Sequence, residues 1–547
     1  MKKFNYLSLI IVFGISTSLN QTFGQSKLTG QATINASDLR NHMSFLASPL
    51  LKGRPNGGEG LEVAARYLAT QAGLIGLKPA NEGSFYKSYP VVKKSIDPDK
   101  TSVTVISGDK QVVLKDQLFQ LVPMGASDYE LEGDIVFAGY GLKLDKYKYN
   151  DLDTLKITGK VLLVLNRAPL ESDGKTCKLG DKNLLGMQGL QMKLQSLMMA
   201  RPKAVLIVTD PKSGFQSFDQ ANPGLAEYLV SSTTLKGQKG MTFDMPGVPK
   251  IIFIHRNVAD AILSGTGHTL AELQDAIDLD LKCHSFAIPS KKIKISEASI
   301  TKENLMPNIA GIIEGSDPVL KNEVIIYSAH MDHIGGTGDK INPGADDDAS
   351  GCVALLEIAQ AYSSLPKKPL RTIMFLWVSG EEVGLFGSQS YVENPIFPLD
   401  KTVADLNIDM IGRVKGVADT SKENPMTGPK GVFVISDNQS KELNSIADAV
   451  ASKTGLTLDY SLSGRDHPLS LFSRSDHFNF VRKNIPILFF TSGIHTDYHT
   501  PGDVIEKIDF NKVELVAKTM FEIGQKVANQ KNRIVVDNPF TKNTTGQ

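Results

Sequence analysis

The sequence predicts an α/β fold, in which a mainly parallel twisted sheet has helices on both faces and a β-rich domain is inserted into the chain. Two observations lead to this prediction. From about residue 300 onward, continuous apolar runs of strand length alternate with helical patterns, which is typical of parallel strands buried on both faces. Residues 97–295 instead carry many short β-type runs, so we expect them to form a separate unit.

The chain before the insert has one strong helical pattern. Apolar residues recur at intervals of three and four between Leu61 and Ile75, and Gly76 and Pro79 end the pattern. We therefore assign residues 25–96 to the N-terminal part of the main domain.

The inserted region combines β-type runs with one helical segment. A helix rich in Met and Leu is expected at 190–200, where its methionines suit core filling better than metal binding. The β-type runs lie at 134–138, 160–165, 204–209 and 250–254.

The main domain is expected at 296–530, and a polar tail follows at 531–547. In this domain, apolar runs have the length of strands and amphipathic segments have the length of helices. The expected strands are 309–313, 324–328, 372–378, 403–408 and 485–491, and the expected helices are 350–362, 385–393 and 511–528.

Composition and charge exclude several classes of protein. The 547 residues are 41% hydrophobic and 22% charged, which excludes a mainly disordered chain. Lys and Arg together number 59, as do Asp and Glu, and no basic run stands out, so we expect no nucleic-acid partner. The 3 cysteines are too few for a disulfide framework. A Cys177–Cys283 bridge stays open at this stage, and Cys352 is expected to be a buried thiol.

The first residues have the pattern of a secretory signal peptide. Two lysines precede an apolar run at 6–15, and Thr22 and Gly24 are spaced like a cleavage site. The apolar run is too short for about 30 Å of bilayer hydrocarbon. We therefore expect removal of residues 1–24, export to the periplasm, cell surface or exterior, and no stable membrane insertion.

Histidines and acidic residues gather just after the predicted strands. Because the carboxyl ends of parallel strands lie at one sheet edge, where ligands bind, we expect these side chains to meet in one crevice. Imidazole and carboxylate ligands without thiolate favour Zn²⁺ or Mn²⁺ at a hydrolytic site. The candidates are His330, Asp332, His333, Asp346, Asp347, Asp348, Glu381, Glu382, Asp409, Asp476, His477, His495, Asp497 and His499.

A two-metal hydrolase needs more than terminal ligands. One carboxylate must reach both ions, and another must stay uncoordinated to move protons. Glu381 and Glu382 are adjacent and point in different directions, so they can divide the roles of base and ligand. The sequence has no G-x-S-x-G, H-E-x-x-H or G-x-x-x-x-G-K-[ST] motif that would offer a competing chemistry.

Several of these motifs have ordinary structural alternatives. The acidic run at 346–348 alone is typical of a solvated turn and helix cap. His333, His477 and His495, taken singly, fit hydrogen-bonded histidines better than ligands, and residue chemistry does not choose between His495 and His499. What favours a metal site is the order of the motifs and their placement at successive strand ends.

Six motifs follow one another over about residues 300–530: SAHMDH, GADDDASG, SGEEVGLFGS, NIDMIGR, SDH and YHTPGD. In this order they resemble the co-catalytic zinc exopeptidases, a family that includes secreted bacterial leucyl aminopeptidases, glutamate carboxypeptidases and the transferrin receptor ectodomain. The helix around Leu61 is similar to the family's N-terminal part. Residues 97–295 resemble the protease-associated domain that many members carry.

The resemblance implies two zinc ions per chain and a role for each matching residue. Asp347 would bridge both ions, and Glu381 would be the general base and acid. Tyr498, before the last histidine, would stabilise the oxyanion. His330 and Asp409 would be the terminal ligands of one zinc, and Glu382 and His499 those of the other.

The resemblance also implies residues that support the ligands. Asp332 would hydrogen-bond the far nitrogen of His330 and fix its tautomer. A cis peptide would join Asp347 to Asp348. Asp348 and His477 would lie in the layer around the ligands.

The implied function is hydrolysis of N-terminal residues from peptides by a secreted di-zinc aminopeptidase. A carboxypeptidase or dipeptidase of the same family is an alternative, with Arg413 and Arg465 as candidate carboxylate contacts. Two alternatives of another class are a glutaminyl cyclase-like acyltransferase, which keeps one zinc, and a receptor-like binding protein that has lost ligands. The five filled ligand positions argue against both. Side-chain preference and oligomeric state stay open.

Overall fold

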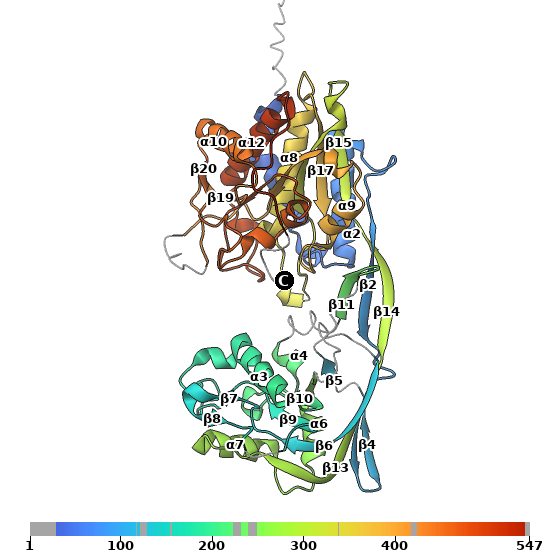
Figure 1. Ribbon diagram of the computed structural model, residues 1–547, viewed down its shortest axis with the longest axis vertical. Coiled ribbons are helices and arrows are strands. Elements are labelled where there is room, and N and C mark those ends of the chain that lie inside the picture. The colour runs from blue at the N-terminus through green and yellow to red at the C-terminus, as the bar shows by residue number, and fades with distance from the viewer. Residues whose placement is uncertain are drawn as a thin grey trace, which may run out of the picture.

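The computed structural model describes residues 29–541, apart from 116–117, 121–127, 154–155, 223–230, 239–248, 337 and 417–423. The expected signal peptide at 1–24 lies outside the described residues. Figure 1 shows two lobes along the long axis of the molecule, each built around its own sheet. The first helix, α1 (Ala36–Leu46), and the last, α12 (Phe510–Asn529), both belong to the upper lobe.

The upper lobe contains an eight-stranded sheet. Its order is β1 (Lys78–Pro79), β15 (Ile309–Ile313), β17 (Thr372–Val378), β16 (Val324–His330), β18 (Thr402–Ile408), β21 (Ile487–Thr491), β19 (Gly431–Ile435) and β20 (Thr457–Asp459). Its four central strands, β17, β16, β18 and β21, pair in parallel, and all their residues are buried. This confirms the predicted mainly parallel sheet, whose strands are rich in apolar residues because both faces are covered.

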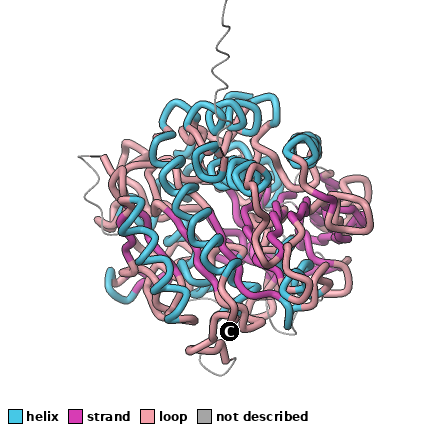
Figure 2. The backbone as a smooth tube through the Cα atoms, turned by 90° about the horizontal axis from the view of Figure 1, so that it is seen from above, coloured by secondary structure: helices cyan, strands magenta, loops and turns pink. Residues whose placement is uncertain are grey.

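Helices lie on both sides of this sheet (Figure 2). In β16, Ile325 and Tyr327 point into one core, and Val324 and Ile326 point into the opposite one. The first core is shared with α1, α12, α2 (Glu59–Ile75), α8 (Gly351–Ser363) and α10 (Lys441–Thr454), and the second with α9 (Phe386–Glu393) and α11 (His477–Val481).

The lower lobe, formed by the inserted region, contains a second eight-stranded sheet. Its order is β4 (Lys110–Leu114), β3 (Ser102–Ser107), β13 (Phe286–Glu297), β6 (Tyr129–Phe137), β9 (Val161–Leu165), β10 (Ala204–Val208), β12 (Lys250–Ile254) and β5 (Leu118–Gln120). The run from β6 to β12 is parallel. Its cores also include residues of α3 (Met187–Ala200), α6 (Arg256–Leu263) and α7 (Leu270–Asp280). The insert is therefore itself a mixed α/β unit.

Three antiparallel strands connect the lobes along one side (Figure 1). They are β11 (Ser231–Leu235), β2 (Tyr89–Ile96) and β14 (Ser299–Met306). The chain leaves the upper lobe through β2 and returns through β14. At the start of β2, the Tyr89 hydroxyl donates a hydrogen bond to the Ser379 carbonyl oxygen at 2.8 Å, which ties the connection to the end of β17.

The cysteines and the hydropathy of the helices bear on two expectations. Cys177 and Cys283 do not form a disulfide in the structure. Cys352 is buried, as expected, and its thiol donates to the His330 carbonyl oxygen at 3.1 Å. Among the described residues, no helix combines the length and the apolar character needed to span a membrane.

Candidate metal centre

The predicted ligands lie at the carboxyl edge of the parallel strands. His330 is the last residue of β16, Asp409 follows β18, and Glu382 lies in the turn after β17. Asp347 lies in the short helical turn Ala345–Ser350, which leads into α8. Because the sheet is parallel here, residues far apart in the sequence meet at one edge.

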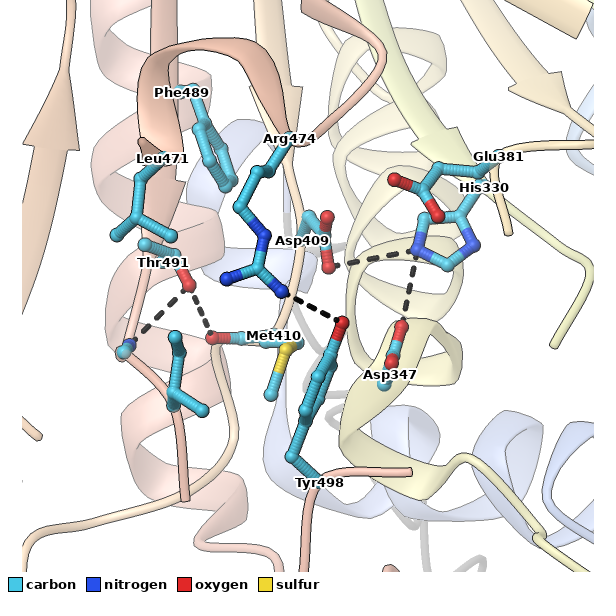
Figure 3. A pocket seen from close by; sticks show the side chains of 12 residues that line it. His330, Asp347, Glu381, Asp409, Met410, Leu471, Arg474, Phe489, Thr491 and Tyr498 are labelled. Atoms are coloured by element: carbon cyan, nitrogen blue, oxygen red, sulfur yellow. Dashed lines mark hydrogen bonds and ion pairs between the residues drawn. The ribbon is translucent and has the colours of Figure 1, made fainter. Parts of the chain in front are cut away.

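One group of donor atoms consists of His330, Asp347 and Asp409 (Figure 3). The Nε2 atom of His330 lies 3.2 Å from Asp347 Oδ1 and 3.6 Å from Asp409 Oδ1. All three side chains are buried. These are the residues expected to hold one zinc.

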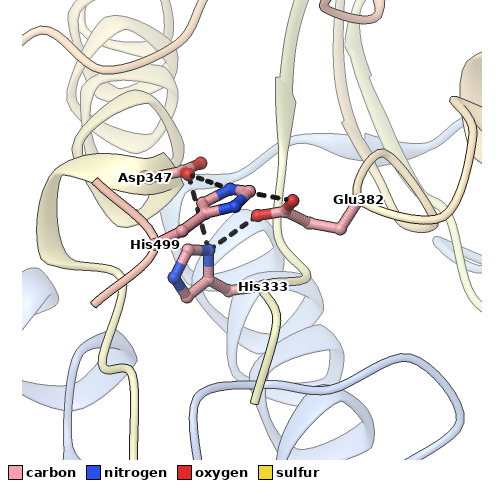
Figure 4. Close-up of side chains that lie close together, drawn as sticks. All are labelled: His333, Asp347, Glu382 and His499. Carbon is pink, nitrogen blue, oxygen red and sulfur yellow. Dashed lines mark hydrogen bonds and ion pairs between the residues drawn. The ribbon is translucent and has the colours of Figure 1, made fainter. Parts of the chain in front are cut away.

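The second group consists of His333, Asp347, Glu382 and His499 (Figure 4). The Nε2 atom of His499 lies 3.2 Å from Asp347 Oδ2 and 3.1 Å from Glu382 Oε2. The Nδ1 atom of His333 lies 2.7 Å from Glu382 Oε1 and 3.6 Å from Asp347 Oδ2. Asp347 thus offers one carboxylate oxygen to each group, as a bridging ligand must.

Both groups fit a divalent cation by chemistry and by spacing. Tetrahedral zinc with bonds of 2.0–2.1 Å would hold its ligand atoms about 3.3 Å apart, and the spacings of His330 and His499 to their carboxylates are 3.1–3.6 Å. Among the described residues, Asp409 Oδ1 and His499 Nε2 are buried without a hydrogen-bond partner. Such unsatisfied atoms are costly unless something else binds them.

The electrostatics of the centre lead to the same inference. Burial raises the pKa of Glu381 well above its usual range, and the neighbouring carboxylates of Glu382 and Asp409 raise it further, against the opposing effect of His330. Burial lowers the pKa of His499, but its contacts with Asp347 and Glu382 outweigh this and bring the pKa to about 10. In the absence of cations, the cluster therefore holds protons to offset its negative charge.

Two acidic residues hold the ligand loops in place. The Asp348 carboxylate accepts hydrogen bonds from the backbone N–H groups of His330, Gly351 and Met410. The Asp332 carboxylate accepts one from Asn56 Nδ2 at 2.7 Å and two, each at 3.3 Å, from the backbone N–H groups of residues 381 and 382. The cis peptide between Asp347 and Asp348 is present.

Asp332 hydrogen-bonds the far nitrogen of His330 through its backbone carbonyl oxygen and not through its carboxylate. The Nδ1 atom of His330 lies 3.8 Å from Asp332 Oδ1, but only 3.1 Å from the carbonyl oxygen of Asp332. The carboxylate instead accepts hydrogen bonds from the loop after β17. The backbone therefore fixes the orientation of His330.

Two histidines that the sequence left open lie outside the ligand groups. His477 is fully buried, stacks on Phe489 with ring centroids 4.5 Å apart, and hydrogen-bonds the Phe472 carbonyl oxygen at 3.0 Å. It packs behind Phe489, which lines the cavity, and within the described part of the chain no contact of His477 with a residue of the two ligand groups is found. His495 lies 3.6 Å from Asp346 Oδ2. The structure brings His499 to the centre instead.

Arg54 is a site residue that the sequence analysis missed. The residue is 1% exposed. It donates to five carbonyl oxygens, those of Leu46, Met331, Pro343, Gly344 and Asp347, at 2.6–3.3 Å. It therefore joins the segment before α2 to the loops that carry His330 and Asp347. A single arginine after a glycine gave no sequence signal for this role.

A cavity opens beside the first group (Figure 3). The space within it, counted together with its open mouth, is about 440 Å³. Glu381 and Tyr498 line it, and the ring of Tyr498 stacks on His499 with centroids 3.8 Å apart. The rest of its wall includes Met410, Leu471, Arg474, Phe489, Thr491, Gly493 and Ile494.

Comparisons with known proteins agree with this geometry. The model of peptidase family M28 matches residues 308–524. Leucine aminopeptidase 1 of Trichophyton equinum is 30% identical over 226 residues, which cover 39% of this chain and 56% of that protein. A probable leucine aminopeptidase of Arthroderma otae is 29% identical over 231 residues, 41% of this chain and 58% of that protein. The chain thus spans a little over half the length of these curated relatives.

Among solved structures, a zinc aminopeptidase from Bacillus subtilis has a similar fold. The likeness covers 91% of this chain and 96% of that chain, with 18% sequence identity and a TM-score of 0.50. The family match covers every residue of the two ligand groups. The match to peptidase family M28 supports the resemblance of this region to the co-catalytic zinc exopeptidases.

Proposed function

We propose that this chain is a zinc aminopeptidase that holds two zinc ions and removes N-terminal residues from peptides. The observation that carries the proposal is the position of Asp347, which offers Oδ1 to His330 and Oδ2 to His499. A carboxylate shared in this way by two groups of donors suits a pair of cations better than one.

The ligands divide between two positions. His330, Asp347 and Asp409 would hold one zinc, and Asp347, Glu382 and His499 the other, with His333 beside the second position. When bound, a zinc pair supplies a water that ionises near neutral pH and a Lewis acid for the peptide carbonyl. Four carboxylates, those of Asp347, Glu381, Glu382 and Asp409, would balance the charge of two divalent ions.

Glu381 is proposed as the group that moves protons. It lines the cavity but belongs to neither ligand group. Its backbone N–H donates to Asp332, which fixes the position of the residue. Its carboxylate would stay uncoordinated. Glu381 would take a proton from the attacking water and give it to the leaving amine.

Tyr498 is proposed to stabilise the developing negative charge. Its ring lies flat against His499, and its hydroxyl points into the cavity toward Arg474 (Figure 3). The hydroxyl stays protonated at neutral pH, because burial raises its pKa above the usual value and the charges of Asp347 and Glu382 raise it further. It can therefore donate a hydrogen bond to the carbonyl oxygen of the substrate as that oxygen becomes negative.

Aminopeptidase is favoured over carboxypeptidase by the charge of the site. The acidic residues around the cavity suit a protonated N-terminal amine. The two arginines considered as carboxylate contacts are both paired elsewhere: Arg413 with Asp497 and Asp503, and Arg465 with Asp437. The names of the curated relatives also favour this reading.

Two further parts of the proposal concern the rest of the chain. Residues 97–295 would form an inserted, protease-associated-like domain, between an N-terminal part at 25–96 and a main catalytic domain at 296–530. The segment 1–24 would be a signal peptide that exports the protein.

A peptide panel tests the proposed activity. Purified protein loaded with zinc is given leucyl peptides with free N-termini and the same peptides with acetylated N-termini. We expect release of N-terminal leucine from the free peptides only. Release of C-terminal residues from the acetylated peptides would favour carboxypeptidase instead, and the absence of hydrolysis in both sets would contradict the proposal.

A further inference from the structure

The loop that carries Glu381 contacts the two strands through which the chain enters and leaves the insert. The loop follows β17 and begins with Ser379 and Gly380. Tyr89 is the first residue of β2, Met306 is the last residue of β14, and the two are paired in register. Both side chains are buried. The chain thus leaves for the insert at Tyr89 and returns from it at Met306.

The Tyr89 side chain is packed against the backbone of this loop. Its hydroxyl donates to the Ser379 carbonyl oxygen at 2.8 Å and lies 3.1 Å from Ser379 Oγ. The next residue, Gly380, has a φ of +75°, and a Cβ atom there would lie 2.6 Å from the Tyr89 hydroxyl oxygen and 3.4 Å from Met306 Cε. Glycine permits both this φ and this close approach.

Asn308, two residues after the end of β14, holds the same loop from the other side. Its Oδ1 atom accepts from the Ser379 backbone N–H at 3.1 Å, and its Nδ2 atom donates to the Gly387 carbonyl oxygen at 2.9 Å. The side chain of Asn308 is buried. Ser379 is therefore held at its N–H by Asn308 and at its carbonyl oxygen by Tyr89.

The two glutamates that follow depend on this support to different degrees. The Glu382 carboxylate lies 2.7 Å from His333 Nδ1 and 3.1 Å from His499 Nε2. Among the described residues, none donates a hydrogen bond to the Glu381 carboxylate, although the backbone N–H of Glu381 donates to Asp332. The position of the Glu381 carboxylate therefore depends on where the backbone of the loop places it.

We propose that Tyr89 is a positioning residue for Glu381, because its hydroxyl fixes the peptide between Ser379 and Gly380 at the start of the loop. This inference rests on the proposed role of Glu381 as the group that moves protons. It gives the strand pair β2–β14 a role in turnover besides joining the lobes. A displacement of about 1 Å can cost a reaction roughly 100-fold in rate, so one hydrogen bond at this point matters.

The test compares Tyr89→Phe, which removes the hydroxyl and keeps the ring, with Tyr327→Phe. Tyr327 is the matched control, because it is buried in the same lobe, donates to the Met520 carbonyl oxygen at 2.9 Å and does not line the cavity. We measure kcat and KM on leucyl peptides at saturating zinc, zinc affinity by titration, and the melting temperature. Hydrogen exchange of the metal-free protein reports on the backbone at 379–382 without any need for turnover.

We expect Tyr89→Phe to lower kcat by ~10- to 100-fold and to change KM by less than about twofold, because the lost interaction acts on the transition state. Zinc affinity should stay near that of the unaltered protein, since Glu382 keeps its contacts with His333 and His499. Hydrogen exchange at 379–382 should become faster. Tyr327→Phe should lower the melting temperature by a similar amount and leave kcat and this exchange unchanged.

Three results would overturn the inference. An unchanged kcat in Tyr89→Phe would mean that the hydroxyl only stabilises the fold. Activity that is restored by more zinc would mean that Tyr89 acts through Glu382 and the metal. Exchange at 379–382 equal to that of the unaltered protein would mean that Tyr89 does not hold the loop. Failure of the unaltered enzyme to hydrolyse any of the peptides would instead refute the proposed function, and the exchange comparison would still decide whether Tyr89 holds the loop.

Discussion

The two lobes use the same architecture but treat their buried acids differently. In the lower lobe, Asp210 pairs with Arg167 through two contacts of 2.7 Å, and Asp278 accepts from Tyr140 at 2.8 Å and Lys212 at 2.7 Å. Each of these carboxylates is matched by a donor from the protein. Such pairs are costly to break but perform no chemistry.

In the upper lobe, the acids at the sheet edge outnumber their basic partners. Arg54 bonds to backbone carbonyls and leaves the carboxylates of the centre to the histidines. Asp409 Oδ1 has no hydrogen-bond partner within the described part of the chain. A parallel sheet edge rich in buried acids is therefore structural when the protein supplies the cations, and a candidate metal site when it does not.

The largest expected effect distinguishes catalysis from zinc binding at the carboxyl edge of the upper sheet. Glu381→Gln removes the proposed proton carrier without removing a ligand, so kcat should fall by roughly 10²- to 10⁴-fold while zinc content stays at the level of the unaltered protein. Asp278→Asn, in the lower lobe, should lower thermal stability but leave kcat of the folded enzyme unchanged. Glu381→Gln with nearly normal turnover would contradict the assignment.

The next effect compares two buried arginines. Arg54→Met leaves five carbonyl oxygens without their donor, and we expect a loss of about 3–5 kcal/mol of unfolding free energy together with weaker zinc binding. Arg167→Met should destabilise the lower lobe and leave zinc affinity unchanged. Chemical denaturation of both variants measures the free energy of unfolding, and zinc titration measures the affinity for zinc. Equal zinc affinities in the two variants would mean that Arg54 does not support the metal centre.

A smaller effect tests the unexpected histidine of the second group. His333→Ala removes the 2.7 Å contact with Glu382, so the affinity for one of the two zinc ions should fall by ~10- to 100-fold and that for the other should not. His495→Ala is the control, because His495 is buried nearby but lies outside both groups. If the affinities for both zinc ions fall equally, or neither falls, His333 has no specific role at the second position.

The smallest effect is the dependence of zinc affinity on pH. In the metal-free protein the pKa of His499 is about 10, so below that pH a cation must displace its proton, and affinity should rise by about tenfold per pH unit for each proton released. The same raised pKa stabilises the metal-free fold below the ordinary value of 6.5, and this contribution is lost as pH rises through about 10. Calorimetry at pH 6.5 and 7.5, in buffers of different ionisation enthalpy, counts the protons. Equal zinc affinities at the two pH values, together with no proton release, would contradict the displacement of a proton by zinc.

Much of the centre could be predicted because its residues follow strands. The apolar runs place His330 and Asp409 at the ends of β16 and β18, and parallel pairing brings these ends together. The contacts of Asp332 and His477 could not be predicted from the sequence, because they depend on the conformation of the loops. The loop after β17 donates a backbone hydrogen bond to the Asp332 carboxylate, and His477 stacks on Phe489.

Other features had no local signal at all. Arg54 acts on loops 277–293 residues further along the chain, and only the folded structure reveals these contacts. The insert showed its β-type runs clearly. Its parallel order, however, depends on crossovers between strands that short apolar runs do not specify.

The central claim is that two divalent cations complete the acid-rich edge of the upper lobe, bridged by Asp347. Elemental analysis of the purified protein after zinc loading and dialysis tests it most directly, with Asp347→Asn measured alongside. We expect two zinc ions per chain in the unaltered protein and fewer than one in the variant. A single ion or none in the unaltered protein, or two retained in the variant, would contradict it.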